Sequence, residues 1–295
     1  MVKKNIVGQV ILNIIFIFLA VAALAPFLLL VSSSLTSEAT LAKYGYNFYP
    51  REFTLAAYEY IFKSSKLIFR AYAITIIVTA VGTTISVLTT VLFAYPLSRK
   101  ELPGRMVVSF ILFFTMLFNG GLVPSYIMWT QMFHIKNTYF ALLIPSLLMS
   151  AFYVIMMRSY FTANIPNEII EAARVDGARE FMVLFRIVLP LSKPMIATIA
   201  LMIGLRYWND WTNSLYYITD ADKFSVQAVL NTMLNNINFL AQNPDVIADS
   251  SMMKELPSTA VRMGVAVVGV LPILAAYPFF QKHFVKGIVV GGIKG

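Results

Sequence analysis

Cysteine is absent from this 295-residue chain, histidine occurs only twice, and charged residues make up only 13% of it. The absence of cysteine excludes disulfide bonds and thiolate metal sites. His134 and His283 lie far apart and next to different apolar segments, which argues against a zinc site or a histidine general base. The sequence also lacks paired carboxylates, an activated nucleophile and a GxxxxGK[ST] phosphate loop. We therefore expect no enzyme activity, no metal site and no cofactor bound by this chain itself.

Hydrophobic residues, in contrast, make up 59% of the chain. Soluble globular proteins contain about half apolar and a quarter charged residues, so this composition indicates a protein that crosses the membrane several times. The net charge of +9 is a value also found in nucleic-acid-binding proteins. In a membrane protein, such an excess reflects lysine and arginine in cytoplasmic loops. We therefore expect membrane lipid, and not nucleic acid, as a partner.

Six segments are long and apolar enough to cross a membrane, for which about 20 residues are needed. They are continuous apolar runs, unlike the roughly ten-residue alternating strands of a membrane barrel. The sequence therefore predicts an all-α polytopic membrane protein, with six transmembrane helices in a single transmembrane domain over residues 1–295. The predicted spans are residues 10–33, 69–97, 106–130, 138–157, 191–218 and 261–281.

Basic residues indicate the orientation of these spans. The short loop from Ser98 to Arg105 carries three basic residues, and short basic loops stay in the cytoplasm. This loop predicts that both termini are inside the cell (N-in, C-in). The two long loops, about 34–68 and 219–260, are then extracellular. The second is rich in Asn and Asp and is either a solvated connector or a functional segment, since loops this long are usually functional or disordered.

The long stretch on the predicted cytoplasmic side is residues 158–190. Asn164 and Pro166 predict a helix start, since Asn caps helices and Pro is tolerated in the first turn. Gly177 predicts the end of that helix, because glycine adopts the left-handed conformation that terminates helices. The first helix is expected to place on one face Ile169, Ile170 and Ala173. A second helix follows with apolar residues at amphipathic spacing, at Phe181, Leu184, Phe185 and Val188. Such a knob either lies on the lipid surface or docks a soluble partner.

The sequence of this loop resembles a known motif. The tripeptide Glu-Ala-Ala alone is a weak signal, because these residues favour any helix. The full run from Glu171 to Pro194, EAARVDGAREFMVLFRIVLPLSKP, closely resembles the cytoplasmic EAA loop of bacterial ABC importer permeases. Similarity to the carbohydrate-uptake branch, and within it to the second permease subunit of Gram-positive oligosaccharide importers, extends to residues 119–126, 137–138, 277–287 and 292–295.

This resemblance implies a type I ABC importer permease in the cell membrane of a bacterium, with a Gram-positive one expected. It also implies a homologous second permease subunit, two ATPase subunits that use ATP and Mg, and an extracellular lipid-anchored sugar-binding protein. The ATPase subunits would dock on the loop, and ATP binding would bias the spans between two states. The residues implied in coupling to the ATPase are Glu171, Ala172, Ala173, Asp176, Gly177 and Ala178.

A polar stretch, Arg206–Asn213, lies inside the predicted fifth span. Ionisable residues inside a membrane are costly and usually face a cavity or each other. Arg206 and Asp210 are four residues apart, so on a continuous helix they would share a face and could form a structural ion pair. Alternatively, the stretch lines a sugar path, and a similar WN[D/E] stretch occurs in sugar permeases of this branch. The candidate substrate-path residues are Arg206, Trp208, Asn209, Asp210, Trp211 and Asn213; for the tryptophans, interfacial anchoring is the alternative.

A second break is predicted at Asn119–Gly121 in the third span. Non-helical backbone in a membrane is tolerated only where protein or a water-filled cavity covers it, so this break indicates either a pathway constriction or tight helix packing. The alternative to an importer subunit is a stand-alone secondary transporter or channel, with Arg206 and Asp210 as an ion-coupling pair. An uncharged oligosaccharide is the expected cargo, although Arg206 leaves an acidic sugar open.

Overall fold

A computed structural model describes residues 6–63, 65–242 and 258–291. Within these ranges the regular elements are helices, and the only strand-like pairing is an antiparallel bridge between Thr36 and Phe53. The predicted all-α class is therefore confirmed. The chain divides into two compact units, one within Met1–Ile68 and Leu230–Pro272 and one within Phe69–Val229 and Ile273–Gly295.

Three of the predicted spans form long apolar helices. They are α1 (Ile6–Ser34), α4 (Ser65–Ser98) and α15 (Ser258–Gly291). At a rise of about 1.5 Å per residue, each exceeds the roughly 30 Å of a bilayer core. The first, second and sixth predicted spans are thereby confirmed as helices of spanning length.

The third predicted span is not one continuous helix. α5 (Arg105–Leu117) is followed by α6 (Leu122–Ile127) and the π-helical turn η1 (Met128–Met132), and the helical direction bends by 112° between α5 and the segment Leu122–Met132. Between them, Gly121 has a φ of 87°, a conformation that favours glycine. The side chain of Asn119 accepts a hydrogen bond from the Gly121 N–H at 2.8 Å, which fixes the turn. The predicted break is therefore present.

The fourth and fifth predicted spans are also interrupted. The fourth consists of the single turn α7 (Phe140–Leu143) and the 14-residue α8 (Ala151–Asn164), which is too short to cross a membrane alone. The fifth, predicted over 191–218, consists mainly of α12 (Lys193–Trp208) and α13 (Thr212–Tyr217). At its start the chain bends by 84° from the segment Glu180–Leu191, which comprises α10 (Glu180–Val183), η2 (Leu184–Val188) and α11 (Leu189–Leu191). The described residues thus contain three candidate spans, or up to five if each bent pair counts as one, and the predicted six continuous helices are not confirmed.

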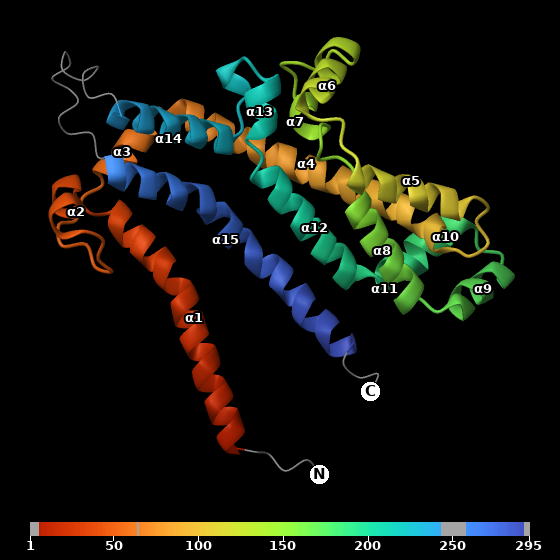
Figure 1. The fold of residues 1–295 in the computed structure, drawn as a ribbon. Coiled ribbons are helices and arrows are strands. Elements are labelled where there is room, and N and C mark those ends of the chain that lie inside the picture. Colours follow the sequence, from red (N-terminus) through yellow and green to blue (C-terminus); the bar gives the residue numbers. More distant parts are fainter. Residues whose placement is uncertain (1–5, 64, 243–257, 292–295) are drawn as a thin grey trace. The chain divides into compact units, whose positions relative to one another are not determined.

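The two long loops contain helices that the sequence did not predict. The first holds α2 (Glu38–Tyr44) and α3 (Ala56–Phe62). The second holds the 3-10 turn η3 (Ala221–Lys223) and the 17-residue α14 (Val226–Gln242); its residues 243–257 lie outside the described ranges. In the first unit, the Glu38 carboxylate accepts the N–H groups of Thr259 and Ala260 at 3.0 and 3.1 Å. This contact holds α2 beside the start of α15 (Figure 1) and satisfies donors that a helix start leaves unpaired.

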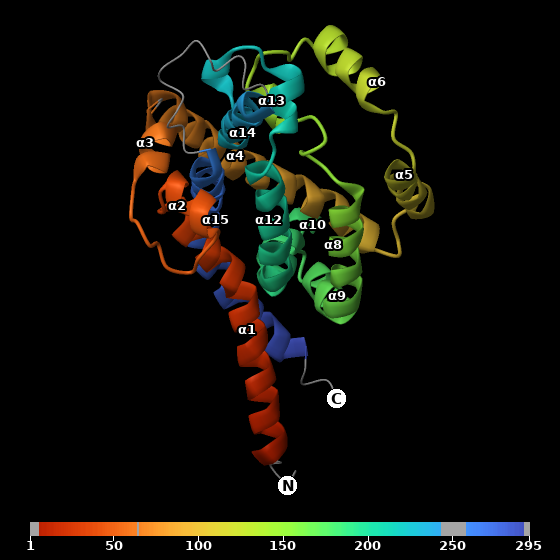
Figure 2. The same ribbon diagram turned by 60° about the vertical axis from the view of Figure 1, so that its left-hand side comes forward.

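The core of the second unit forms where α12 packs on α4. The ring of Tyr207 is buried against Gly82 of α4, and a Cβ at Gly82 would clash with that ring. The Tyr207 hydroxyl donates to the carbonyl of Leu143 at 2.8 Å. α12 also contacts α8, beside which it lies in both ribbon views (Figure 1, Figure 2). Since α12 has 16 residues, its two ends are roughly 24 Å apart.

Candidate functional site

Residues 158–164 of the predicted loop form the end of α8, and a short, largely exposed helix follows them. α9 (Asn167–Val175) starts after Pro166, whose φ of −59° suits a helix start. Asn164 was expected to cap this helix, but its side chain donates to the carbonyl of Tyr160 within the preceding α8. Ile170 and Ala173 of α9 are buried, whereas Ile169, expected on the same face, is exposed.

Gly177 ends α9 as predicted. It has a φ of +79°, and its N–H donates to the carbonyl of Arg174 at 3.0 Å. The next N–H, of Ala178, reaches back to the carbonyl of Ala173 at 2.9 Å. This pair of hydrogen bonds is the Schellman motif, which requires a left-handed residue at its centre. The turn therefore depends on glycine for its backbone conformation.

The second helical part of the loop differs from the simple amphipathic pattern. Leu184 and Val188 are buried, as expected, but Phe181 is 71% exposed and Phe185 is exposed too, while Val183 is buried instead. A π-helical turn spans residues 184–188. A π turn bonds i to i+5, so the residues that face the core shift relative to a 3.6-residue period.

Glu180 links the two helical parts of the loop to each other and to α4. This residue was not identified from the sequence. One carboxylate oxygen accepts from Nε of Arg174 at 2.8 Å, across the Gly177 turn. The other accepts from the hydroxyl of Tyr95, near the end of α4, at 2.7 Å. These donors hold the pKa of the Glu180 carboxyl below its usual range, the Tyr95 hydroxyl having the larger effect. No signal in the sequence pairs two residues that are 85 positions apart.

The residues implied in ATPase coupling differ in exposure. Ala173 lies on the buried face of α9, and Ala178 is partly buried. The remaining four are exposed and available to a partner: Glu171, Ala172, Asp176 and Gly177. The loop therefore presents a compact surface at the start of the bent fifth segment.

A polar pocket of about 390 Å³ lies at the other end of α12. Its lining comes from three interruptions of the helices, at residues 119–125, 145–147 and 206–217. Breaks that are separate in the sequence thus converge on one cavity. This arrangement covers non-helical backbone in the way that a membrane protein requires.

Arg206 and Asp210 both line this pocket but do not pair with each other. α12 ends at Trp208, so the continuous helix that would place them on one face is absent. Arg206 instead donates to the carbonyl of Ser146 at 2.6 Å. The Asp210 carboxylate accepts from the Thr212 hydroxyl at 2.7 Å and the Asn213 N–H at 3.3 Å. Among the described residues, the ion pairs do not include Arg206 with Asp210, so the structure lacks the ion pair considered as one of the two alternatives.

The other candidate path residues divide between the pocket and its surroundings. Asn213 lines the pocket and donates to the carbonyl of Pro145 at 3.0 Å. Asn209 is not part of the lining, and its side chain donates to the carbonyl of Leu205. Trp208 is buried against Tyr72 and Trp211 is 39% exposed; neither lines the pocket. Three of the six candidates therefore share one cavity.

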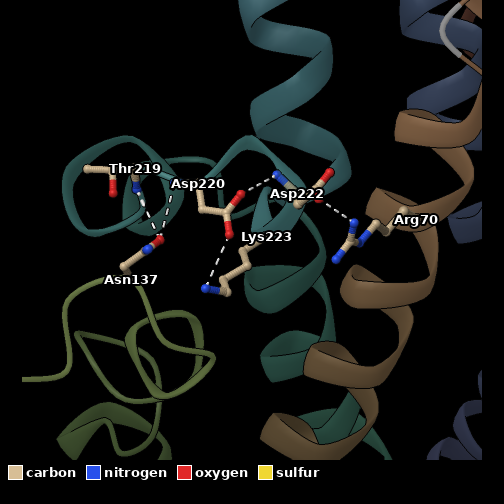
Figure 3. Close-up of polar contacts among 6 residues, drawn as sticks. All are labelled: Arg70, Asn137, Thr219, Asp220, Asp222 and Lys223. Carbon is tan, nitrogen blue, oxygen red and sulfur yellow. Dashed lines mark hydrogen bonds and ion pairs between the residues drawn. The ribbon is translucent and has the colours of Figure 1, made fainter.

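A polar cluster fixes the chain just after the pocket (Figure 3). Asn137 has a φ of +59°, and its side-chain oxygen accepts the N–H groups of Thr219 and Asp220 at 3.4 and 3.1 Å. Its own N–H donates to the carbonyl of Tyr217, a pocket residue, at 2.8 Å. The sequence marked Asn137 only through a family resemblance.

The same cluster reaches α4 (Figure 3). Asp220 accepts the N–H of Asp222 at 3.1 Å and pairs with Lys223 at 3.3 Å, and both interactions lower the pKa of the Asp220 carboxyl. Asp222 pairs with Arg70 of α4 at 2.6 Å. These exposed ion pairs add little stability individually, so the cluster acts mainly by fixing the geometry of the turn.

Comparison with known proteins identifies the family. Residues 1–290 match the family described as binding-protein-dependent transport system inner membrane component. Protein LplC of Bacillus subtilis is 37% identical over 96% of this chain and 94% of its own length. The polygalacturonan/rhamnogalacturonan transport system permease protein YtcP of the same organism is 33% identical over 99% and 100%. A bacterial ABC transporter that imports the acidic polysaccharide alginate contains a chain of 28% identity with a TM-score of 0.78, covering 96% of this chain and 99% of that one. The chain therefore belongs to the family of inner membrane components of binding-protein-dependent transport systems.

Proposed function

We propose that this chain is the permease subunit of an ATP-driven importer and forms half of the path of an oligosaccharide. The observation that carries this proposal is the position of the polar pocket, at the opposite end of α12 from the 158–190 loop. One rigid helix thus joins a cavity with hydrogen-bonding side chains to an exposed surface suited to a motor protein. Two of the proteins named above, the polygalacturonan/rhamnogalacturonan transport system permease YtcP and the ABC transporter involved in alginate import, support this assignment.

The 158–190 loop is the proposed docking surface for the ATPase. Its exposed residues, including Glu171 and Asp176, would contact the ATPase on the cytoplasmic side. The Glu180 bridge to Tyr95 would then pass movement of the loop to α4 as well as to α12. ATP shifts the equilibrium between two states of the spans only if it binds one of them more tightly. A second permease subunit would complete the path, and an extracellular binding protein would deliver the sugar.

A neutral oligosaccharide is our first candidate for the cargo, because Arg206 and Asp210 in the pocket have opposite charges. A uronate-containing oligosaccharide is the second. It is favoured by the alginate importer and by YtcP, whose names refer to acidic polysaccharides. A stand-alone transporter that couples ions through Arg206 and Asp210 finds no support, since these residues are not paired and the family is described as a component of binding-protein-dependent transport systems.

The test is purification of the tagged chain from its native membrane in mild detergent, with ATPase activity measured on the eluate. We expect a second permease and an ATPase to purify with it. The binding protein recovered with the complex is then titrated with neutral and uronate oligosaccharides. Recovery of the chain alone, with transport intact in vesicles that contain no ATPase, would refute the importer assignment.

A further inference from the structure

A second pocket, of about 610 Å³, lies in the same unit where α4 ends. Its walls are mainly apolar and come from the last two turns of α4, from residues 99–103 after that helix and from the 158–190 loop, with Leu92, Pro96, Leu102 and Leu184 among them. We call it the Arg99 pocket, after the charged residue that follows α4. It is separate from the polar pocket, with which it shares no lining residue.

Arg99 is the unusual member of this pocket. The residue is only 8% exposed, and its guanidinium lies 4.9 Å from the centre of the Tyr95 ring. Nε and one terminal nitrogen are buried without a hydrogen-bond partner. A buried charge is costly unless it is paired and hydrogen-bonded. An unpaired guanidinium lining a pocket therefore indicates a site for an anionic group.

The neighbouring carboxylates do not fill this role. Both oxygens of Glu180 already accept hydrogen bonds, from Arg174 and Tyr95. Glu101 lines the pocket from an exposed position, and no ion pair of the described residues joins it to Arg99. The four ionisable residues other than Tyr95 in the lining are two arginines and two glutamates, so their formal charges cancel. A ligand with no net charge fits this balance better than one with a surplus negative charge.

The depth of the pocket points to an amphipathic ligand. The candidate span Lys66–Ser98 ends immediately before Arg99. Leu92 and Pro96 of the apolar wall therefore belong to the last turns of a candidate span, and Arg99 directly follows that span, a position where basic side chains meet lipid headgroups. A guanidinium binds phosphate through two parallel hydrogen bonds. Free phosphate would leave the apolar wall unused, whereas a phospholipid uses both parts.

We infer that the Arg99 pocket binds a zwitterionic glycerophospholipid of the membrane. Its phosphate pairs with Arg99, one acyl chain lies along the apolar wall, and an ammonium headgroup reaches Glu101. The bound lipid also lies against Arg174 and Glu180, so it contacts the loop that we propose for ATPase docking. Lipid binding itself does not depend on that function and is measured without transport.

The test is native mass spectrometry of the purified full-length chain, titrated with phosphatidylethanolamine and phosphatidylglycerol of identical acyl chains. The wild type is expected to prefer phosphatidylethanolamine. Arg99→Gln is expected to weaken its binding about tenfold, as loss of a charge-assisted hydrogen bond does. Lys100→Gln, which removes an exposed neighbouring charge outside the lining, is the matched control and is expected to bind like the wild type.

Two further variants complete the test. Glu101→Gln is expected to abolish the preference between the two lipids, and an unchanged preference would overturn the ammonium contact. Leu92→Trp keeps Arg99 but fills the space along the apolar wall. It is therefore expected to weaken lipid binding, and it tests the site even if Arg99→Gln does not fold. Wild-type binding by both Arg99→Gln and Leu92→Trp, or an equal loss in Lys100→Gln, would overturn the site. So would a crosslink from Arg99 to the ATPase in a complex whose chain binds no lipid.

Discussion

Gly177 has open space around it, since no described atom lies within 4 Å of the point that a Cβ would occupy, yet its φ is +79°. Glycine is therefore required here for its backbone conformation, because the left-handed conformation costs other residues roughly 1–2 kcal/mol. We expect Gly177→Ala to reduce sugar uptake several-fold while leaving membrane insertion unchanged, because the Schellman turn shifts. The control is Gly45→Ala, at a residue with a φ of +70° and equally open surroundings outside the loop. Equal uptake by both variants would contradict a special role of the loop.

Asp210 and Asn213 line the polar pocket, whereas Asn209 does not. We expect Asp210→Asn and Asn213→Ala to lower the rate of uptake about tenfold, since a hydrogen bond to a charged group contributes about 1.5–3 kcal/mol. Uptake of labelled oligosaccharide into vesicles measures the effect. Asn209→Ala is the matched control and is expected to stay near the wild-type rate. If Asn209→Ala shows the largest loss of uptake of the three, Asn209 contacts the sugar as expected from the sequence, and the lining of the pocket does not define the path.

Among the elements, α4 and α12 depend on a close approach. A Cβ at Gly82 would overlap the ring of Tyr207, which is buried and held by its hydroxyl at Leu143. Forced overpacking costs about 1–3 kcal/mol, so we expect Gly82→Ala to lower the thermal unfolding temperature in detergent. Gly204→Ala on α12 is the control, because its Cβ would meet only Oγ1 of Thr83, at 3.5 Å. Equal unfolding temperatures would show that the ring moves freely.

The loop and α4 are joined by Glu180 and Tyr95. We expect Tyr95→Phe and Glu180→Gln to reduce ATPase stimulation by the loaded binding protein without lowering the basal rate, because the loop would move independently of α4. The pKa of Glu180 is below its ordinary value of 4.5, so the stabilising effect of its ionised form is present above that value. It is lost as the pH falls through the lowered pKa. Full stimulation in both variants would mean that α12 alone transmits the movement.

For the whole molecule, local sequence patterns predicted the long helices. Of the helix breaks that line the polar pocket, they predicted only one. α1, α4 and α15 follow from apolar runs longer than a bilayer, a property that each segment carries by itself. The Asn119–Gly121 break was also visible, because glycine favours a positive φ. The break after Trp208 was not, since the polar residues around it bond to Ser146 and Pro145, about 60 positions away or more.

For the candidate site too, the sequence predicted the local features and missed the long-range contacts. The EAA motif located the loop and Gly177 located its turn, because both are signals within a few residues. The Glu180–Tyr95 bond and the unpaired state of Arg206 and Asp210 depend on the packing of distant segments. The six residues expected to line the path were chosen on one helix, whereas the pocket draws on three separate segments.

The hydrogen bond from the Asp220 amide to the side chain of Asn137 has a further consequence. An amide bonded to a side chain of another segment exchanges its hydrogen with water only when the two segments separate. Because Tyr217 lines the polar pocket and is bonded to the same Asn137, such a separation would also release one wall of the cavity. Deuterium uptake at this single backbone position would therefore report how often that wall opens, and how ATP or sugar changes that frequency.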